Sequence, residues 1–473
     1  MSTAELTALA PVLGVAATSI VLMAVVAVRR HSTVNTIVTI AGLAASLGLI
    51  SISSRLTPLR VTQLLVIDSV ALFFFALIIA AAAVVVILAH AYLERRGLDN
   101  GELLMLLLFA TLGGCILAAS THFASLFLGL EVLSVSLYAM IAYLRDTDTS
   151  LEAGVKYLIL AAVSSAFLLF GMALVYAHSG DLGFTALAGV EGSPLVLAGV
   201  VLMMVGVGFK LALVPFHMWT ADVYQGAPAP VTAFVATVSK AAVVAVLLRL
   251  LSVAETPPPQ LVWVMALTAA ASIVIGNLLA LRQDNLKRLL AYSSIAHLGY
   301  LMIAVIAGGD DGATAAVFYI AAYIPTTLLA FGVITAFSPE TRDRDFVDDY
   351  VALGEKRPVY AGLLTASLLS LAGIPLTAGF IGKFLVLRSG VGAGAWVLAL
   401  ILVLGSVVSI YYYLRVVVVM YMHETPEWQC GDPEPPVPMT VAAVLIALLA
   451  VILWLGVWPG PVLELVRTAV GAL

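Results

Sequence analysis

Charged residues are scarce in this sequence: aspartate, glutamate, lysine and arginine make up 10% of its 473 residues, whereas 62% are hydrophobic. Ordinary soluble domains are nearer a quarter charged. The net charge of -5 is spread over short connections and a few positions inside apolar runs, so it forms no basic patch that would suit nucleic acid. This composition is that of a polytopic membrane protein.

Cysteine is also nearly absent. The two cysteines are Cys115, in an apolar run, and Cys430, in a polar connection, and their spacing matches neither a metal site nor a disulfide framework. We therefore expect no metal or redox centre in this chain. The N-terminus lacks a basic segment followed by a short apolar core and a small-residue cleavage site. We expect the first apolar run to be retained as a helix and the chain to insert directly into a prokaryotic plasma membrane.

Long apolar runs fill most of the chain. Because a membrane span needs roughly 17 to 25 residues, the runs predict an all-α polytopic membrane protein with about fourteen transmembrane helices. The predicted spans are 10–28, 34–54, 64–92, 103–119, 122–144, 153–178, 194–217, 229–253, 260–281, 288–307, 312–337, 360–387, 394–422 and 438–463. The short connections leave no room for a soluble domain, so residues 1–473 are predicted to form a single integral membrane domain.

Lysine and arginine are distributed unevenly between the two sides of the predicted bundle. One side carries Arg29, Arg30, Arg95, Arg96, Arg145, Arg282, Lys287, Arg288, Arg342, Arg344, Lys356 and Arg357. The other side has Arg55, Arg60, Arg249, Arg388 and Arg467. Because cytoplasmic connections are enriched in these residues, both termini are predicted to lie outside. An even number of spans agrees with this topology.

Four ionisable residues lie within the apolar runs: Glu131, Lys210, Lys240 and Lys383. Each charge at the centre of a membrane helix costs about 3 kcal/mol on insertion scales, so these positions indicate a function in charge or proton movement. Burial disfavours the charged form of a lysine, and a nearby carboxylate favours it. We therefore expect Glu131 to pair with Lys210, and the making and breaking of this pair to act as a proton switch.

Two histidines are candidates for relaying protons between the lysines, because imidazole titrates near neutrality. His217 follows Lys210 by seven residues, which is about two turns along one helical face if Pro215 does not disturb the register. His297 lies between Lys240 and Lys383 in chain order. A core histidine with satisfied hydrogen bonds is the alternative for His297.

The seventh and twelfth spans each combine a buried lysine with a proline, Lys210 with Pro215 and Lys383 with Pro375. A proline inside a membrane helix frees a backbone carbonyl, which is tolerated only beside a cavity or other protein. Both spans are therefore predicted to be broken helices. Since five spans separate them, we expect two inverted five-helix repeats, at about 101–253 and 260–422. Helices one to three, in about 1–100, precede them, and a last helix at about 438–463 follows.

Other charged residues have simpler interpretations. Lys156 begins the sixth span, where a long side chain either reaches the membrane interface or takes part in function. Lys287 and Arg288, at the start of the tenth span, are expected to be interfacial anchors. The same expectation holds for Arg249 and Arg415 near span ends, and Asp68 is also expected at the interface.

Three ordered motifs resemble the antiporter-like subunits of respiratory complex I, and those of the N type in particular. They are PFHMWTADVYQGAPAP at 215–230, LKRLLAYSSIAHLGY at 286–300 and SLAGIPLTAGFIGKF at 370–384. The resemblance extends from about residue 60 onward. It implies fourteen helices, two inverted repeats with a half-channel in each, and a central line of charged residues. It places the pairing carboxylate on Glu131, its partner on Lys210, the central lysine on Lys240, bridging histidines on His217 and His297, and the terminal lysine on Lys383.

The resemblance also implies a function: a proton-translocating membrane subunit of NADH:quinone oxidoreductase, which acts as a translocase. Redox chemistry is expected in partner subunits, which would hold NADH, FMN, iron-sulfur clusters and quinone, with no cofactor in this chain. The expected partners are other membrane subunits of complex I, including other antiporter-like ones, and the lipid bilayer. The alternatives are a subunit of a multi-subunit Na+/H+ antiporter, and a scaffold that does not pump.

Overall fold

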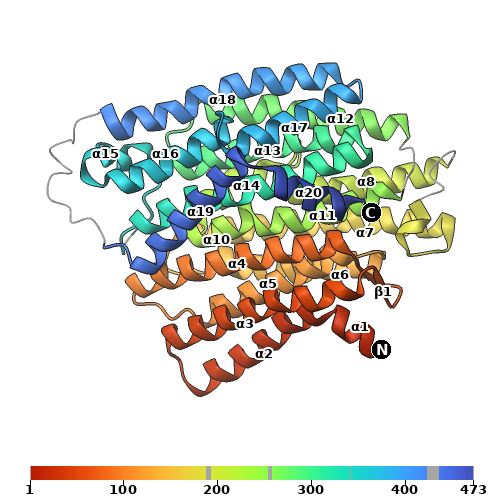
Figure 1. Ribbon diagram of the computed structural model, residues 1–473, viewed down its shortest axis with the longest axis horizontal. Helices are drawn as coiled ribbons and strands as arrows, with labels where there is room; N and C mark the ends of the chain where they lie inside the picture. The colour runs from red at the N-terminus through yellow and green to blue at the C-terminus, as the bar shows by residue number, and fades with distance from the viewer. Residues whose placement is uncertain (1, 188–192, 254–257, 341, 423–435, 472–473) are drawn as a thin grey trace.

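The computed structural model describes residues 2–187, 193–253, 258–340, 342–422 and 436–471, and its long helices pack side by side in one bundle (Figure 1). In chain order the helices are α1 (Thr3–Ala8), α2 (Ala10–Val28), α3 (Ser32–Ser53), α4 (Ser69–Arg95), α5 (Gly101–Ala119), α6 (Phe123–Ile141), α7 (Asp148–Ser179), α8 (Pro194–Leu211), α9 (Met218–Gly226), α10 (Ala229–Ala236), α11 (Val238–Ser252), α12 (Pro259–Ala280), α13 (Leu286–Ala307), α14 (Gly309–Phe337), α15 (Leu353–Lys356), α16 (Pro358–Ala372), α17 (Ala378–Gly392), α18 (Trp396–Met422), α19 (Met439–Val457) and α20 (Gly460–Val470). Two short strands, β1 (Leu59–Val61) and β2 (Leu65–Ile67), form an antiparallel pair.

The number of spans agrees with the prediction. Within the described ranges, thirteen helical segments are long and apolar enough to cross a membrane, counting α10 and α11 as one. Helices α16 and α17 lie end to end (Figure 1) and occupy the place of the predicted twelfth span. The prediction of an all-α membrane protein with about fourteen spans is therefore confirmed.

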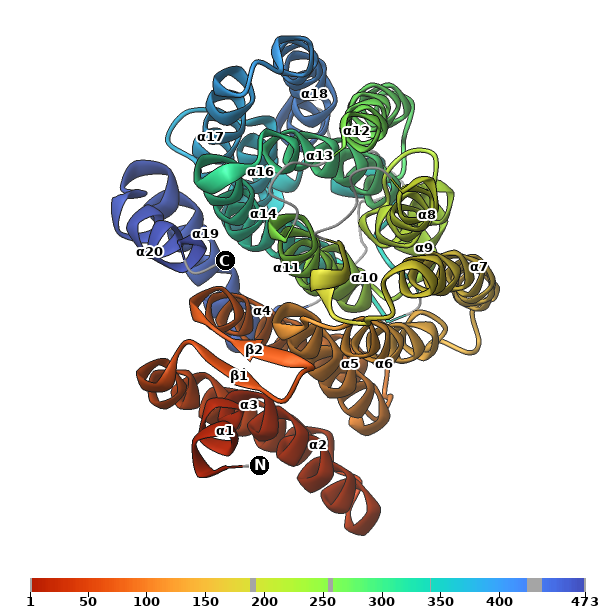
Figure 2. The ribbon, with the colours of Figure 1, turned by 90° about the vertical axis from the view of Figure 1, so that its right-hand side faces the viewer.

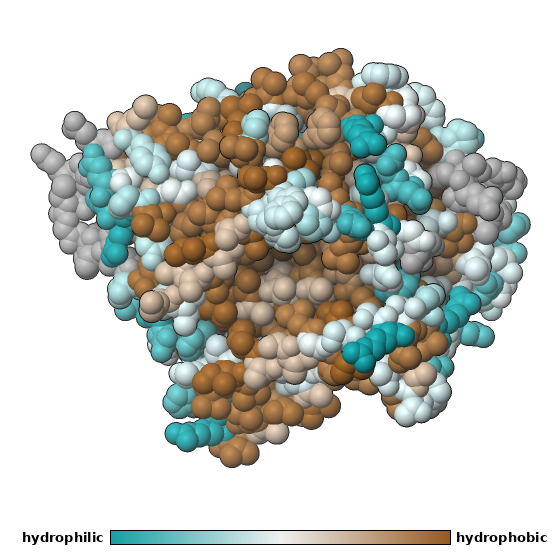
Figure 3. All heavy atoms as spheres, viewed as in Figure 1, coloured by the Kyte–Doolittle hydropathy of each residue, from teal (hydrophilic) through white to brown (hydrophobic). Residues whose placement is uncertain are grey.

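The most buried helices lie at the centre of the bundle. Helices α10, α11 and α14 are buried over all of their most apolar length, and α13 over most of it. The end-on view places α11 and α14 in the middle, with α2 and α3 at one edge and α18 at another (Figure 2). Hydrophobic atoms cover the flank of the bundle, and hydrophilic atoms gather toward its two ends (Figure 3). Both termini lie toward the same end (Figure 1).

Two predicted boundaries are wrong. The third span begins at Ser69 rather than at residue 64, because 65–67 belong to β2 and Asp68 caps α4 by accepting a hydrogen bond from the Ala71 amide at 2.8 Å. The last predicted span, 438–463, is two helices. Helix α19 ends before Pro459, and α20 is an amphipathic helix that buries Val466.

The predicted eighth span contains a break that the sequence analysis missed. Thr237 separates α10 from α11, and its Oγ1 donates a hydrogen bond to the carbonyl of Ala233 at 2.6 Å. The Thr237 amide instead bonds to the carbonyl of Phe234 at 3.2 Å. Threonine hydroxyls that bond back to the preceding turn bend helices. Lys240 therefore lies in the first turn of a new helix.

The chain also leaves helical geometry between α8 and α9 and between α16 and α17. Ala212, after α8, has φ 59°, and α9 begins only at Met218. Gly373, after α16, has φ 85°, a left-handed conformation that glycine adopts without strain, and α17 begins at Ala378. These interruptions place helix ends inside the bundle, next to Lys210 and Lys383.

Candidate functional site

Lys240 is fully buried and has neutral hydrogen-bonding partners. Its Nζ donates to Ser294 Oγ on α13 and lies 5.7 Å from the ring centre of Tyr224 on α9. Ser294 Oγ in turn shares a 2.6 Å hydrogen bond with the hydroxyl of Tyr323 on α14. No carboxylate in the described part of the chain forms an ion pair with Lys240. Within the described residues, its ammonium group is therefore held by one hydroxyl, that of Ser294, beside the ring of Tyr224.

Lys210, in the last turn of α8, is in a similar environment and is 2% exposed. Its Nζ donates to Ser134 Oγ on α6 at 2.7 Å and to the Tyr157 hydroxyl on α7 at 3.2 Å. The Nζ also lies 5.0 Å from the centre of the Tyr157 ring. Like Lys240, this lysine has hydroxyl groups as its direct partners.

The direct contact expected between Glu131 and Lys210 is absent in this structure. Glu131 Oε1 instead accepts a hydrogen bond from Ser165 Oγ on α7 at 2.6 Å. Within the described residues these two side chains form no ion pair, because Ser134, one turn along α6 from Glu131, contacts the lysine. Glu131 and Lys210 both hydrogen-bond to α7, Glu131 to Ser165 and Lys210 to Tyr157, but they do not bond to each other.

Lys383, in the second turn of α17, is 7% exposed. Its Nζ donates to the carbonyl of Ala372 at 2.9 Å and lies 5.2 Å from the ring centre of Tyr300. Ala372 is the last residue of α16, and the final carbonyls of a helix have no partner within the helix. The break in the twelfth span thus supplies the acceptor for this lysine.

His297 is buried in α13, and both of its ring nitrogens have partners. Nδ1 lies 2.7 Å from the hydroxyl of Tyr319 on α14, and Nε2 lies 3.3 Å from the hydroxyl of Tyr413 on α18. Tyr413 also shares a short hydrogen bond with Ser293. The imidazole is thus part of a network that joins three helices.

His217 is positioned differently from the prediction. Since α8 ends at Leu211, His217 does not lie on the same helical face as Lys210. Its Nδ1 is buried and makes no well-aligned hydrogen bond within the described residues. The break beside Lys210 therefore separates the two residues instead of aligning them.

The sequence analysis missed the hydroxyl groups that contact these lysines and His297. They come from five helices and belong to Ser134, Tyr157, Ser294, Tyr319 and Tyr413. A further hydroxyl, that of Tyr323, bonds to Ser294. Serine and tyrosine are common in membrane helices, where they hydrogen-bond between neighbours. Their residue type alone gave no sign of which ones face a lysine.

Three residues expected at the membrane interface are buried ion-pair partners. Lys287 is 1% exposed, and its Nζ lies 2.8 Å from Asp343 and 3.4 Å from Asp345. Burial alone would raise the pKa of Asp343, but the nearby charges of Lys287 and Arg96 hold that pKa below its ordinary value. At the other end of the bundle, both carboxylate oxygens of Asp68 accept hydrogen bonds from Arg249.

Arg249 Nη1 and Nη2 lie 2.8 Å and 2.5 Å from the two carboxylate oxygens of Asp68, and its Nε donates to the carbonyl of Ala118 at 2.7 Å. Two parallel bonds from one guanidinium to one carboxylate make a strong and directional pair. This pair ties the start of α4 to the end of α11. Both side chains lie at helix ends and are buried, so they bind each other inside the protein and do not extend to its surface as anchors.

Lys156 and Arg288 form ion pairs nearer the surface. Lys156 Nζ lies 2.8 Å from Asp222 and 2.6 Å from Glu152, and its side chain is 43% exposed. Asp222 also pairs with Arg288 at 2.8 Å. Lys156 therefore has an environment unlike that of the three buried lysines with hydroxyl or carbonyl partners.

The described parts of the chain bring no three His, Cys, Asp or Glu side chains together as a metal ion would require. Cys115 is a buried free thiol, and Cys430 lies outside the described residues.

A family model and curated proteins similar to this chain are named after NADH:quinone oxidoreductase. The family model described as "NADH:quinone oxidoreductase/Mrp antiporter, TM" matches residues 120–409. A protein of Ectopseudomonas mendocina named NADH-quinone oxidoreductase subunit N is 47% identical over 98% of this chain and 96% of its own length. A protein of the same name from Methylococcus capsulatus is also 47% identical, over 98% and 95%.

Solved structures share the fold. A chain of respiratory complex I from Thermus thermophilus with bound aureothin matches with a TM-score of 0.85 and 35% identity, covering 97% of this chain and 100% of that one. A chain of the Mrp complex from Dietzia matches with a TM-score of 0.89 and 21% identity, covering 100% and 97%, which supports the fold alone. From its matched region and its near full-length relatives, this chain belongs to the family of transmembrane subunits found in NADH:quinone oxidoreductases and Mrp antiporters.

Proposed function

We infer that this chain is a proton-translocating membrane subunit of an NADH:quinone oxidoreductase. The observation that carries this proposal is the set of three buried lysines, Lys210, Lys240 and Lys383, whose direct partners are hydroxyls or a carbonyl. A hydroxyl accepts a bond from an ammonium group and donates one to a neutral amine. Such a lysine therefore gains or loses a proton without leaving a partner unsatisfied.

The proposed proton-transfer residues are Glu131, Lys210, His217, Lys240, His297 and Lys383. Glu131 and Lys210 face the same helices, so a small movement of α8 relative to α6 would make or break their contact. His217 has a buried nitrogen with no well-aligned hydrogen bond within the described residues, which suits a group that receives a proton only after such a movement. His297 lies in the central network, and Lys383 lies at the break between α16 and α17.

The remaining parts of the proposal concern the assembly. The chain would lie in a prokaryotic plasma membrane with both termini outside, and residues of about 101–253 and 260–422 would form two inverted repeats. Other membrane subunits, including antiporter-like ones, would contact it. NADH, FMN, iron-sulfur clusters and quinone would bind to partner subunits, whose redox steps would drive changes in the buried charges here. The names of the 47% identical relatives support this assignment.

The test is the Lys240→Ala variant in membranes that contain the whole complex. We expect normal assembly on a native gel, with NADH:quinone turnover and the proton gradient both reduced at least about tenfold, a lower bound for losing a positioned proton-transfer group. Ser239→Ala is the matched control, because the Ser239 hydroxyl, next to Lys240 in the chain, donates to the backbone carbonyl of Val235 in α10 at 3.0 Å and not to a lysine or histidine.

Two results would contradict the proposal. Unchanged turnover and pumping by fully assembled Lys240→Ala complex would leave the chain as a scaffold. Loss of sodium tolerance on deletion of the chain, without loss of NADH-driven pumping, would instead indicate a subunit of a cation/proton antiporter.

A further inference from the structure

The imidazole of His297 is bracketed by two tyrosine hydroxyls from different helices. Tyr319 on α14 bonds to Nδ1 at 2.7 Å, and Tyr413 on α18 lies 3.3 Å from Nε2. All three side chains are buried. A neutral imidazole has one N–H and one lone pair, so one tyrosine must donate to the ring while the other accepts from it. The hydrogen bonds can therefore run in either of two directions, with the imidazole proton on Nε2 or on Nδ1.

We propose that Tyr319 and Tyr413 are proton-relay residues on the two sides of His297. The inference rests on the proposed function, because it concerns the path between the lysines. It adds two residues that carry the proton into and out of the imidazole.

The proposed step is a set of coupled proton transfers with no redox change. A proton arrives at the Tyr319 oxygen, and the original Tyr319 hydroxyl proton moves to Nδ1. The Nε2 proton then passes to the Tyr413 oxygen as the Tyr413 hydroxyl proton moves to Ser293 Oγ, with which it already shares a hydrogen bond, and Ser293 releases its own hydroxyl proton to a water molecule. One proton enters and one leaves, and His297 ends in its other tautomer. Reorientation of the ring and hydroxyls resets the chain.

A chain of hydrogen bonds that starts at Lys240 ends close to Tyr319 and His297. Lys240 bonds to Ser294, and Ser294 bonds to Tyr323. Tyr323 and Tyr319 are four residues apart on α14, so they lie on the same helical face. The ring of Tyr323 also lies 5.7 Å from the ring of His297, centre to centre.

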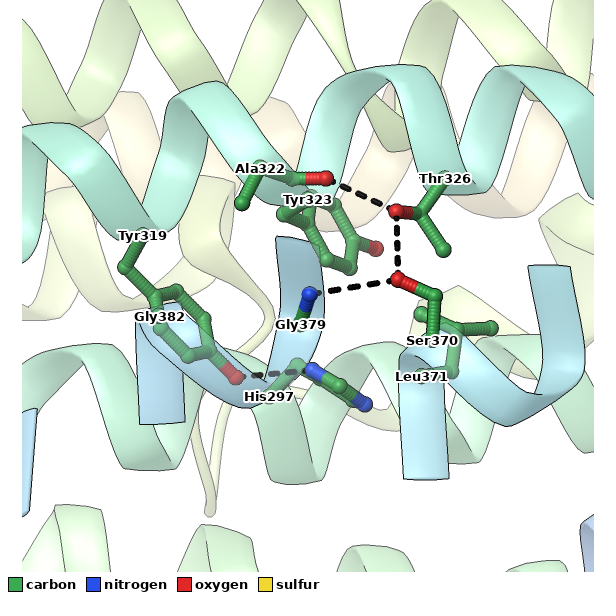
Figure 4. Close-up of a pocket in the computed structure, with 9 residues that line it drawn as sticks. All are labelled: His297, Tyr319, Ala322, Tyr323, Thr326, Ser370, Leu371, Gly379 and Gly382. Carbon is green, nitrogen blue, oxygen red and sulfur yellow. Dashed lines mark hydrogen bonds between the residues drawn. The ribbon is translucent and has the colours of Figure 1, made fainter. Parts of the chain in front are cut away.

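A small cavity lies beside Tyr319 and Tyr323. It has a volume of about 10 Å³ and is lined by His297, Tyr319 and Tyr323 together with Thr326, Ser370 and residues of α17 (Figure 4). This is roughly the room that one water needs. The space allows the hydroxyls of Tyr319 and Tyr323 to change direction, which a proton relay requires.

Helix α17, which carries Lys383, packs against Tyr319. Gly382, which precedes Lys383, lines the cavity, and a Cβ added there would lie 3.2 Å from Cδ2 of Tyr319. The absence of a side chain at Gly382 lets α17 pack directly on the Tyr319 ring. Tyr319 therefore lies between His297 and the helix that carries Lys383.

The test compares Tyr319→Phe and Tyr413→Phe with Tyr350→Phe in the assembled complex. Each variant removes one hydroxyl and keeps the ring. Tyr350 is the matched control, because it is also buried but its hydroxyl donates to the backbone carbonyl of Arg344 at 2.9 Å, away from His297. We expect the first two variants to lose about tenfold in NADH-driven proton pumping, and to show a larger solvent deuterium isotope effect than the parent. Tyr350→Phe should stay within about twofold of the parent.

Assembled Tyr319→Phe and Tyr413→Phe complexes that pump at the parent rate, with an unchanged isotope effect, would overturn the inference. If the phenylalanine variants fail to assemble, fluorinated tyrosine at position 319 keeps the hydroxyl and makes it more acidic. The pumping rate should then change with the degree of fluorination, and a constant rate would overturn the relay.

The Lys240→Ala variant separates failure of this inference from failure of the proposed function. If Lys240→Ala stops pumping while the tyrosine variants pump normally, the relay is wrong and the proposed function stands. If Lys240→Ala also pumps normally, the proposed function itself fails.

Discussion

Two buried lysines in this bundle have opposite surroundings. Lys240 is 0% exposed and Lys287 is 1% exposed. Lys287, at one end of the bundle, lies 2.8 Å from Asp343 and 3.4 Å from Asp345, whereas Lys240 contacts the hydroxyl of Ser294. Burial by itself therefore does not set the role of a lysine, because the role also depends on whether its partner is charged or neutral.

The physical difference lies in what happens when the lysine loses its proton. Removing the charge from Lys287 would leave its two neighbouring carboxylates with Arg96 as the cation that still contacts Asp343, and this loss of a buried ion-pair partner is strongly unfavourable. Removing the proton from Lys240 leaves a neutral amine that accepts a hydrogen bond from Ser294. The ion-paired end of the bundle is therefore suited to holding helices in place, and the region around Lys240 is suited to changing its protonation.

Lys287→Met should have the largest effect on stability. Breaking a buried ion pair costs about 3 to 5 kcal/mol, so we expect a lower thermal unfolding temperature of the purified complex and less assembled complex on a native gel. Lys240→Met, which removes a charge at similar depth, is the control and should leave stability unchanged or higher. Equal destabilisation by the two substitutions would break the comparison.

Ser294→Ala should have an intermediate effect, and on activity rather than assembly. It removes the hydroxyl that bonds to Lys240, and leaving a buried polar group unsatisfied costs about 1 to 3 kcal/mol. We expect pumping to fall several-fold, less than in Lys240→Ala, as measured by NADH-driven acidification in vesicles. Ser294→Thr, which keeps a hydroxyl, should recover most of the rate. If Ser294→Ala pumps like the parent, the hydroxyl is not a functional partner.

Lys156→Ala should have the smallest effect. Its ion pairs with Glu152 and Asp222 are partly exposed, and such pairs contribute about 0 to 1 kcal/mol. We expect assembly, thermal stability and pumping close to the parent in the same assays. A strong loss of pumping with normal assembly would instead group Lys156 with the buried lysines, and would sharpen the boundary between the two kinds of site.

The sequence predicted the helical fold and the buried lysines because both depend on local composition. A run of apolar residues long enough to cross a bilayer indicates a helix wherever it occurs, and a lysine within it is visible without knowledge of its neighbours. The break at Thr237 was missed because the residues around it are equally compatible with a continuous apolar helix. In the structure the break consists of non-helical backbone angles at Thr237, φ -120° and ψ -73°.

The partners of the charged residues were the main error. Arg249 looked like an interfacial anchor, yet it pairs with Asp68, which lies 181 residues away in the chain. Glu131 was expected to contact Lys210, but serine hydroxyls bond to each of them. Chain distance carries no information about such contacts, because they depend on which faces of the helices meet.

A many-span helical membrane protein with lysines at buried positions can be predicted from the amino-acid sequence, since the length and polarity of each apolar run are local properties. Which lysines contact carboxylates and which contact hydroxyls depends on the folded bundle. That choice depends on how helices distant in the chain are rotated and packed against one another. The difference between an ion-paired lysine and one suited to proton transfer therefore arises only in the folded bundle.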